Sequence, residues 1–448
     1  MIVNRRTFLS NVSLGATGAA TLASGCHFEP YTASDSKTIE VALFEGGFGI
    51  EWHKDMARQY EAMHPGIKVN LWGDPRVDEK IKPRVLRGNP PDLASCTLPV
   101  WKLITAGRLY PLTDALASPS YGQSGKIWSK TLRAGVISDY IYEDKNYALP
   151  SNVGLWGCWY NKSLFRKNEW TAPKTWGEFT DLCDKMLAKG LAPLAFQGKY
   201  PYYSWATILS IYQRLVPFEK WYDVQDFKKG AFLEPEFAHA ADLMQEVSLK
   251  YFQKGALAMT HTESQMEWAN GKTGMVFCGL WLKKEMEKAL PPEFEMACFP
   301  VPMVEGGKGD PQAIYSGGGE TFFVFKDGKH PEIAVDFLKF LLSLDPARDY
   351  VKRNDSLTPV IDCQVGVPIS SALESAVRIL DTSTRMYSDR LNTLFLEWNR
   401  TVLQQAQSDL LRGAINGKTF GEQIEAGAEA VRSNPNIYKP PARGVPAL

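Results

Sequence analysis

The chain has 448 residues, enough for about two or three domains' worth of core. Hydrophobic residues make up 44% and charged residues 22%, which excludes a disordered chain, a collagen and a coiled-coil rod. Lys plus Arg number 50 and Asp plus Glu number 50, so the net charge gives no reason to expect a nucleic-acid partner. Aromatic residues reach 12%, and their rings either fill cores or form platforms for ligands with apolar faces.

Residues 1–26 have the pattern of an export signal. Arg5 and Arg6 precede an apolar run over 12–23, shorter than the ~20 residues that span a bilayer. Arg5–Leu9 resembles a twin-arginine signal, and Leu22–Cys26 resembles the lipobox in which Cys26 is acylated. We expect 1–25 to be a signal peptide and 26–37 a tether. The mature protein is then exported, periplasmic or at the cell surface, and lipid-anchored to the membrane; plain cleavage with unmodified Cys26 stays open.

The next segments alternate between strand and helix patterns. Residues 38–44 are a β-branched run, Trp52, Met56 and Tyr60 recur at helical spacing, and 67–71 alternate as a second strand. Such a β–α–β unit makes a parallel sheet with helices on its faces, so the predicted class is α/β. A capping box at Thr175 and Pro331 each start a further helix.

After about residue 365 the pattern is almost entirely helical. One apolar stripe carries this prediction, at Phe395, Trp398, Val402, Leu403 and Leu410.

Neither a metal nor a cofactor is expected. The six His are scattered, and no nucleotide-binding or nucleophile motif is complete. The mature cysteines show no C-x-x-C spacing, so buried free thiols are predicted, although an oxidising compartment permits disulfides. These cysteines are Cys96, Cys158, Cys183, Cys278, Cys298 and Cys363.

Carboxylates and aromatic residues are the candidates for ligand contact. Glu45, Asp74 and Glu320 follow predicted strands, and ligands of open α/β sheets bind at that edge. They could form the acid and nucleophile of a glycosidase, accept hydrogen bonds from sugar hydroxyls, or be solvated or capping groups. Aromatic clusters at 156–160 and 200–205, with Trp281, suit the C–H faces of sugars, and Tyr202–Trp205 is the favoured group.

Several motifs in order resemble the extracellular solute-binding proteins of bacterial ABC importers, the group that contains maltose-binding protein. The likeness spans roughly residues 38 to 435. Its segments are the helix-to-strand step Gln59–Val69, Pro91–Leu93, Ala106–Asp114, Tyr147–Pro150 with Tyr160–Phe165, Pro173–Phe179, and Gly271–Val276 with Gly279–Trp281.

The resemblance implies a two-lobe periplasmic-binding-protein fold with a cleft between the lobes and a helical C-terminal part. Lobe 1 is expected over 38–150 plus about 302–355, and lobe 2 over 151–301 plus about 356–440. Chain crossings are placed near 147–151, 299–307 and 354–359, and a monomer is expected.

The function implied is capture of a mono- or oligosaccharide by lobe closure and delivery to an ABC transporter permease, without catalysis. Two alternatives remain: a secreted carbohydrate-active enzyme with paired carboxylates, and the binding component of a sensor. The predicted ligand-binding residues are Glu45, Phe48, Asp74, Ser151, Asn152, Tyr202, Trp205, Trp281, Gly318 and Glu320.

Overall fold

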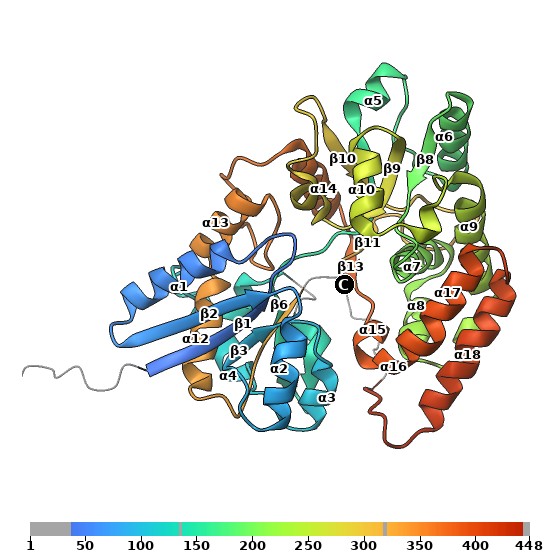
Figure 1. The fold of residues 1–448 in the computed structure, drawn as a ribbon. Coiled ribbons are helices and arrows are strands. Elements are labelled where there is room, and N and C mark those ends of the chain that lie inside the picture. The colour runs from blue at the N-terminus through green and yellow to red at the C-terminus, as the bar shows by residue number, and fades with distance from the viewer. Residues whose placement is uncertain (1–36, 134–136, 317–319, 442–448) are drawn as a thin grey trace, which may run out of the picture. The chain divides into compact units, whose positions relative to one another are not determined.

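The strands gather into two larger sheets, each with its own helices (Figure 1). The computed structural model describes residues 37–133, 137–316 and 320–441. The five-stranded sheet of the first lobe has the order β2 (Ile67–Asp74), β1 (Lys37–Phe44), β3 (Leu93–Ser95), β12 (Thr321–Val324) and β6 (Ala148–Pro150). The four-stranded sheet of the second lobe has the order β10 (Met296–Phe299), β7 (Gly157–Asn161), β9 (Thr273–Cys278) and β8 (Ala192–Ala195).

The first lobe begins with the predicted β–α–β unit. Helix α1 (Glu51–Met63) buries Trp52, Met56 and Tyr60, and β1 and β2 pair in parallel as predicted. Pro331 lies in the first turn of its helix, which confirms the predicted start. The other helices of this lobe are α2 (Val77–Leu86), α3 (Val100–Thr105), α4 (Thr113–Leu116), η1 (Trp128–Thr131), η2 (Ser138–Tyr140), α12 (Pro331–Leu341) and α13 (Leu344–Asn354). A short hairpin joins β4 (Ile141–Tyr142) to β5 (Lys145–Asn146).

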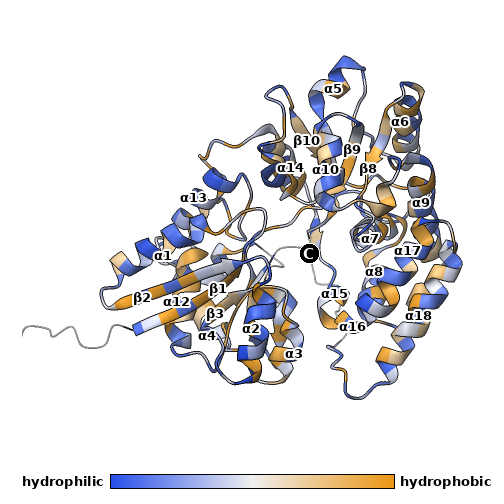
Figure 2. Cartoon of the chain, viewed as in Figure 1, coloured by the Kyte–Doolittle hydropathy of each residue, from blue (hydrophilic) through white to orange (hydrophobic). Residues whose placement is uncertain are grey.

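The second lobe is more helical. Thr175 and Glu178 form the predicted capping box at the start of α6 (Trp176–Ala188). Along the helices, hydrophobic and hydrophilic residues occupy different sides (Figure 2). The lobe's remaining helices before residue 300 are α5 (Lys162–Lys167), α7 (Tyr203–Leu215), α8 (Phe218–Gln225), η3 (Ala231–Leu233), α9 (Pro235–Tyr251), η4 (Ala256–Ala258), α10 (His261–Ala269) and α11 (Leu282–Met286).

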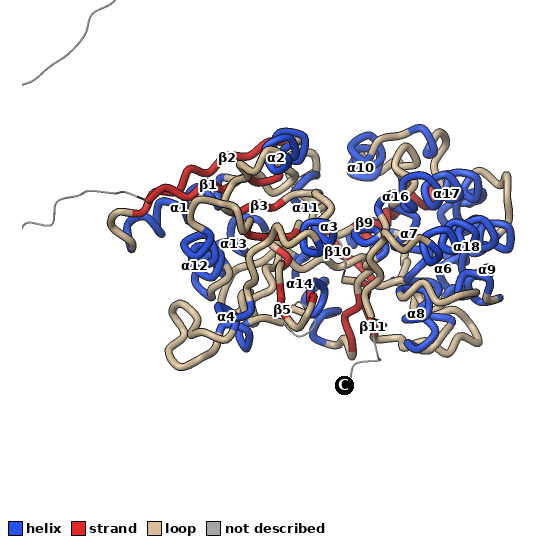
Figure 3. The backbone as a smooth tube through the Cα atoms, turned by 90° about the horizontal axis from the view of Figure 1, so that it is seen from below, coloured by secondary structure: helices blue, strands red, loops and turns tan. Residues whose placement is uncertain are grey.

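The C-terminal part is helical, as predicted, with one short strand among the helices. Strand β13 (Arg385–Tyr387) pairs in parallel with β11 (Ala313–Tyr315), which lies between the two lobes (Figure 3). The predicted stripe is buried at four positions and half-buried at Val402. The helices are α14 (Ser371–Asp381), α15 (Leu391–Leu394), α16 (Leu396–Trp398), the π-helical turn η5 (Asn399–Leu403), α17 (Gln404–Leu411) and α18 (Gly417–Ser433).

The chain crosses between the lobes more than once. Pro150 is the last residue of β6 and Gly157 the first of β7, close to the first predicted crossing. Met303 pairs with the start of α6, and Gly309 donates to the Arg214 carbonyl, so 303–309 lie against the second lobe. These contacts favour a return crossing later than 299–307, after β11. The exact lobe boundaries stay predictions.

The described chain has no helix that is both long and apolar enough to span a membrane. The predicted signal peptide and most of the tether lie outside the described residues.

Candidate functional site

A pocket lies at the carboxyl end of β1, where the strand runs into the glycine-containing loop before α1. Its volume is ≈ 40 Å³, and it contains four of the predicted residues, Phe48, Ser151, Asn152 and Glu320. The parallel β1 and β3 both end at this edge, which is why residues distant in sequence meet here. The other lining residues are Leu43, Phe44, Gly46, Gly47, Gly49, Trp52, His53, Ser95, Phe322, Leu342 and Tyr350.

Glu320 is the acidic group of this pocket. Its backbone carbonyl accepts from the Ser151 amide at 2.7 Å, and its Oε2 accepts from the Asn152 amide side chain at 3.3 Å. Burial raises the pKa of Glu320, and the carboxylate of Glu285 raises it further. Asn152 and Tyr350 line the same pocket. Ser151 and Asn152 of the crossing segment therefore hold Glu320 in place through hydrogen bonds within the protein.

His53 and Trp52 add buried polar atoms to the same pocket. Burial lowers the pKa of His53 to about 4, so the ring is neutral at ordinary pH. Its Nδ1 and the Nε1 of Trp52 are buried and have no hydrogen-bond partner among the described residues. Buried polar atoms without partners are costly, so these two nitrogen atoms lower the stability of the protein at this edge of the sheet.

Glycine at position 47 lets the two lobes approach at this pocket. A Cβ on Gly47 would lie 2.7 Å from Cγ of Glu285, a second-lobe residue in α11. Real Cβ atoms do not approach so closely, so the bare backbone is what fits here. Gly49 has φ +62°, a conformation that favours glycine and redirects the chain into α1.

On the second-lobe side, Glu285 is held by Gln265 of α10. The Gln265 Nε2 donates to Glu285 Oε2 at 2.9 Å, and burial raises the pKa of this carboxyl. Gln265 is fully buried, and its Oε1 has no partner among the described residues. Sequence analysis missed both residues, because neither follows a strand nor stands in an aromatic cluster.

Trp156, Tyr203 and Trp281 form an aromatic cluster in the second lobe. The rings of Trp281 and Trp156 are 6.4 Å apart, and those of Trp156 and Tyr203 are 5.9 Å apart. Burial raises the pKa of Tyr203, and the charge of Glu285 adds to this shift. A Cβ on Gly279 would fall 2.1 Å from the Trp281 ring, so the Gly-x-Trp spacing lets this ring fold back over its own chain.

Helix α7 begins within the Tyr202–Trp205 group, and the members of the group differ in burial. Tyr202 is 44% exposed, and its ring lies 4.9 Å from that of Tyr203 with the two planes tilted by 30°. Trp205 is 1% exposed, and its Nε1 donates to Asp389 Oδ2 at 3.0 Å. Trp205 therefore lies in the second-lobe core, and Tyr203 is the better ligand candidate of this group.

Glu45 and Asp74 lie outside the pocket. Glu45 is exposed, and its backbone amide donates to the Asp74 carbonyl at 3.3 Å. Asp74 binds Lys80, which lowers its pKa, and accepts from the Arg76 amide at 2.8 Å. This is the capping arrangement that sequence analysis kept open. Gly318 lies outside the described residues.

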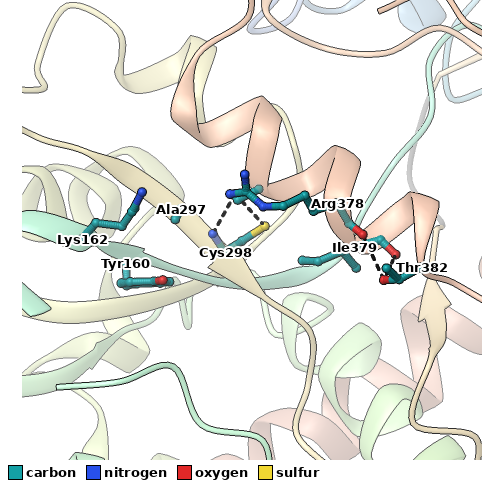
Figure 4. A pocket seen from close by; sticks show the side chains of 8 residues that line it. Tyr160, Lys162, Ala297, Cys298, Arg378, Ile379 and Thr382 are labelled. Atoms are coloured by element: carbon teal, nitrogen blue, oxygen red, sulfur yellow. Dashed lines mark hydrogen bonds between the residues drawn. The ribbon is translucent and has the colours of Figure 1, made fainter.

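A larger cavity of ≈ 380 Å³ lies elsewhere, between the edge strand β10 and α14 (Figure 4). The Cys298 amide donates to Ser375 Oγ at 3.1 Å, which joins the strand to the helix. Lys162 and Arg378 also line this cavity. It contains none of the predicted ligand residues.

The six mature cysteines are buried and free, as predicted. Burial raises the pKa of Cys298 to about 12, so this thiol is unreactive at neutral pH. Within 37–133, 137–316 and 320–441, no group of three His, Cys, Asp or Glu could hold a metal ion.

These features define a two-lobe binding protein with a cleft between α/β lobes, and solved structures share the fold. One, from a study of xylan utilisation by Caldanaerobius polysaccharolyticus, is 19% identical over 87% of this chain and 99% of its own, with a TM-score of 0.74. A chitin oligosaccharide binding protein is 21% identical over 88% and 98%, with a TM-score of 0.72.

The family follows from the sequence. The profile of the bacterial extracellular solute-binding proteins matches residues 49–347, and the chain belongs to this family. Among its relatives is the diacetylchitobiose binding protein NgcE of Streptomyces coelicolor, 27% identical over 92% of this chain and 88% of the relative.

Proposed function

We propose that this protein captures a carbohydrate between its two lobes and delivers it to the permease of an ABC transporter. One observation carries the proposal: Glu285 of the second lobe meets Gly47 of the first, and its charge reaches the ring of Tyr203. That ring belongs to an aromatic cluster with Trp156 and Trp281. Aromatic faces suit the C–H faces of a sugar, while carboxyl and amide groups suit its hydroxyls.

The ligand we favour is an oligosaccharide of N-acetylated amino sugars. Two similar proteins are named for diacetylchitobiose and for chitin oligosaccharides. In the proposed site Asn152 and Glu320 face the ligand from the first lobe, and Gln265 and Glu285 from the second. The first-lobe ring of Phe48 lines the same pocket.

The test is a calorimetric and thermal-shift screen of residues 35–448 against mono- and oligosaccharides, with diacetylchitobiose included. A ligand that binds only the folded state stabilises it by about 2.7 kcal/mol at a hundredfold excess over Kd. We expect saturable binding with the sugar recovered unchanged by chromatography. Absence of binding by every sugar would contradict the proposal.

A second candidate is a carbohydrate-active enzyme, because Glu320 lines the first-lobe pocket and Glu285 approaches Gly47 of the same pocket from the second lobe. Burial raises the pKa of both carboxyls. Two carboxyl groups flanking a glycosidic bond are what hydrolysis requires. The same screen separates the two candidates: cleaved product that disappears in Glu320→Gln would establish the enzyme. We propose binding without turnover, as a monomer.

We also propose that a twin-arginine signal exports the chain and that acylated Cys26 anchors it to the membrane. Arg5, Arg6 and the Leu22–Cys26 motif support this. Cys26→Ser should release the protein into the soluble extracytoplasmic fraction. Membrane retention of that variant would contradict the anchor.

A further inference from the structure

After α18 the described chain leaves the second lobe and reaches the first lobe at Tyr438. Helix α18 packs on α9 and α17. Beyond it, the Tyr438 ring stacks on Trp101 of α3, with centroids 5.6 Å apart and planes at 26°. It also meets Tyr142 of the β4–β5 hairpin edge-on at 5.3 Å. The segment 434–441 thus connects a second-lobe helix to first-lobe side chains.

The contact is a packed aromatic cluster. Trp101 is 4% exposed and lies against Tyr438 and also against Tyr140, at 5.8 Å and 31°. Ile437 and Tyr438 are both half-buried, and burial raises the Tyr438 pKa. Offset aromatic pairs are stabilising beyond the area that they bury, so this segment packs at a specific place on the first lobe.

This contact is separate from the chain crossings that join the lobes. The crossing strands β11 and β13 pair with each other, and Ser388 just after β13 donates to Asp139 of the first lobe at 3.0 Å. The chain then builds α15 to α18 before it returns to the first lobe at Tyr438. A rotation of one lobe relative to the other would either separate Tyr438 from Trp101 or pull residues 434–441 away from α18.

We infer that residues 434–441 are an interlobe strap, in which Tyr438 docked on Trp101 and Tyr142 favours the lobe arrangement in which Gly47 meets Glu285. Contacts present in one arrangement and lost in the other bias the equilibrium between them. Because the apparent affinity scales with the fraction of binding-competent protein, the strap raises ligand affinity without touching the ligand. Only this affinity effect rests on the proposed function.

The test compares Tyr438→Ala with Tyr438→Phe, which keeps the ring, and with Asn436→Ala, an exposed neighbour. Without ligand, we expect Tyr438→Ala to increase the radius of gyration in solution scattering and to speed amide exchange in 100–105. With the sugar found in the screen, it should bind about tenfold more weakly. Both controls should match wild type.

Tyr142→Ala removes part of the same contact from the first lobe and should shift all three readouts in the same direction. This variant keeps the inference testable if Tyr438→Ala fails to fold. An unchanged radius of gyration, or unchanged affinity in a protein that binds sugar, would overturn the strap. Expansion in a series whose wild type binds no sugar would support the strap and contradict the proposed function.

Discussion

At the scale of single residues, Trp281 is the clearest ligand candidate, because its ring lies beside Trp156 and is only half-buried where it packs on the core. We expect Trp281→Ala to weaken sugar binding by more than 1 kcal/mol, about a fivefold change in Kd or more. The melting temperature should hardly change. Isothermal calorimetry and a thermal melt measure the two effects.

Trp170→Ala is the matched control for Trp281→Ala. Trp170 is also half-buried, but it packs on Phe165 and under the Lys189 ammonium, away from the cleft. This control should lose some stability and keep its affinity. Equal loss of affinity in both variants, or wild-type affinity in Trp281→Ala, would remove Trp281 from the site.

Asp389 gives a pH dependence of stability. Burial raises its pKa to about 6 from 3.8, so the folded state binds this proton more tightly than the unfolded chain. The stability it contributes is therefore present below about pH 4 and is lost as pH rises through about 6. The gain in unfolding free energy on acidification, relative to Asp389→Asn, should be about 2–3 kcal/mol.

Denaturant melts of wild type and Asp389→Asn at several pH values between 4 and 7 measure this difference. The comparison removes the titration of the carboxylates common to both proteins from the difference in unfolding free energy. Asp74 is one of these, and its lowered pKa makes stability fall on acidification. A constant difference in unfolding free energy across this range would show that Asp389 does not titrate there.

Sequence patterns identified only part of the candidate site. Phe48, Ser151, Asn152 and Glu320 come together because strand ends of one sheet share an edge. The choice between Tyr203 and Trp205 depends on where α7 begins, since two residues along a helix point to nearly opposite sides. Glu285 was missed because only the tertiary approach of α11 to Gly47 gives it a role.

At the scale of elements, two helices with the same N-terminal motif differ in their distance from the proposed site. Thr175 and Thr260 each form a capping box, at the starts of α6 and α10. Replacing either threonine by alanine should cost about 1 kcal/mol of unfolding free energy. Only α10 carries a residue of the proposed site, Gln265.

Thr260→Ala should therefore weaken sugar binding as well as stability, while Thr175→Ala should change stability alone. Denaturant melts and calorimetry on the two variants make the comparison. Equal affinity in the two variants would mean that the capping of α10 does not position Gln265.

The elements of the first lobe were predictable because their signals are local. The β-branched run at 38–44, the helical spacing of Trp52, Met56 and Tyr60, and the alternation over 67–71 defined β1, α1 and β2 from a short stretch of sequence. The crossings were harder, because the backbone of 303–309 hydrogen-bonds to the second lobe through contacts that no local pattern encodes. Strand β13, three residues long within a helical region, depends likewise on its partner β11.

At the scale of the whole molecule, the contact between Gly47 and Glu285 is where the proposed closure of the lobes can be tested. A valine at 47 would place its Cβ where Cγ of Glu285 lies 2.7 Å away, and Gln265 holds that carboxyl in place. We expect Gly47→Val to disfavour the closed arrangement and to weaken sugar binding about tenfold or more, because less binding-competent protein is present. Since position 47 is exposed, thermal stability should stay near that of wild type.

A double-mutant cycle separates this closure effect from a local loss of ligand contact. Glu285→Ala removes the side chain that valine would meet, so Gly47→Val should cost much less affinity in that background than in wild type. Residues in direct contact couple by about 0.5–3 kcal/mol, whereas independent sites add. Calorimetry on the four proteins gives the coupling energy. Additive losses would mean that Gly47 and Glu285 act on the ligand separately, and that the lobes do not close through this contact.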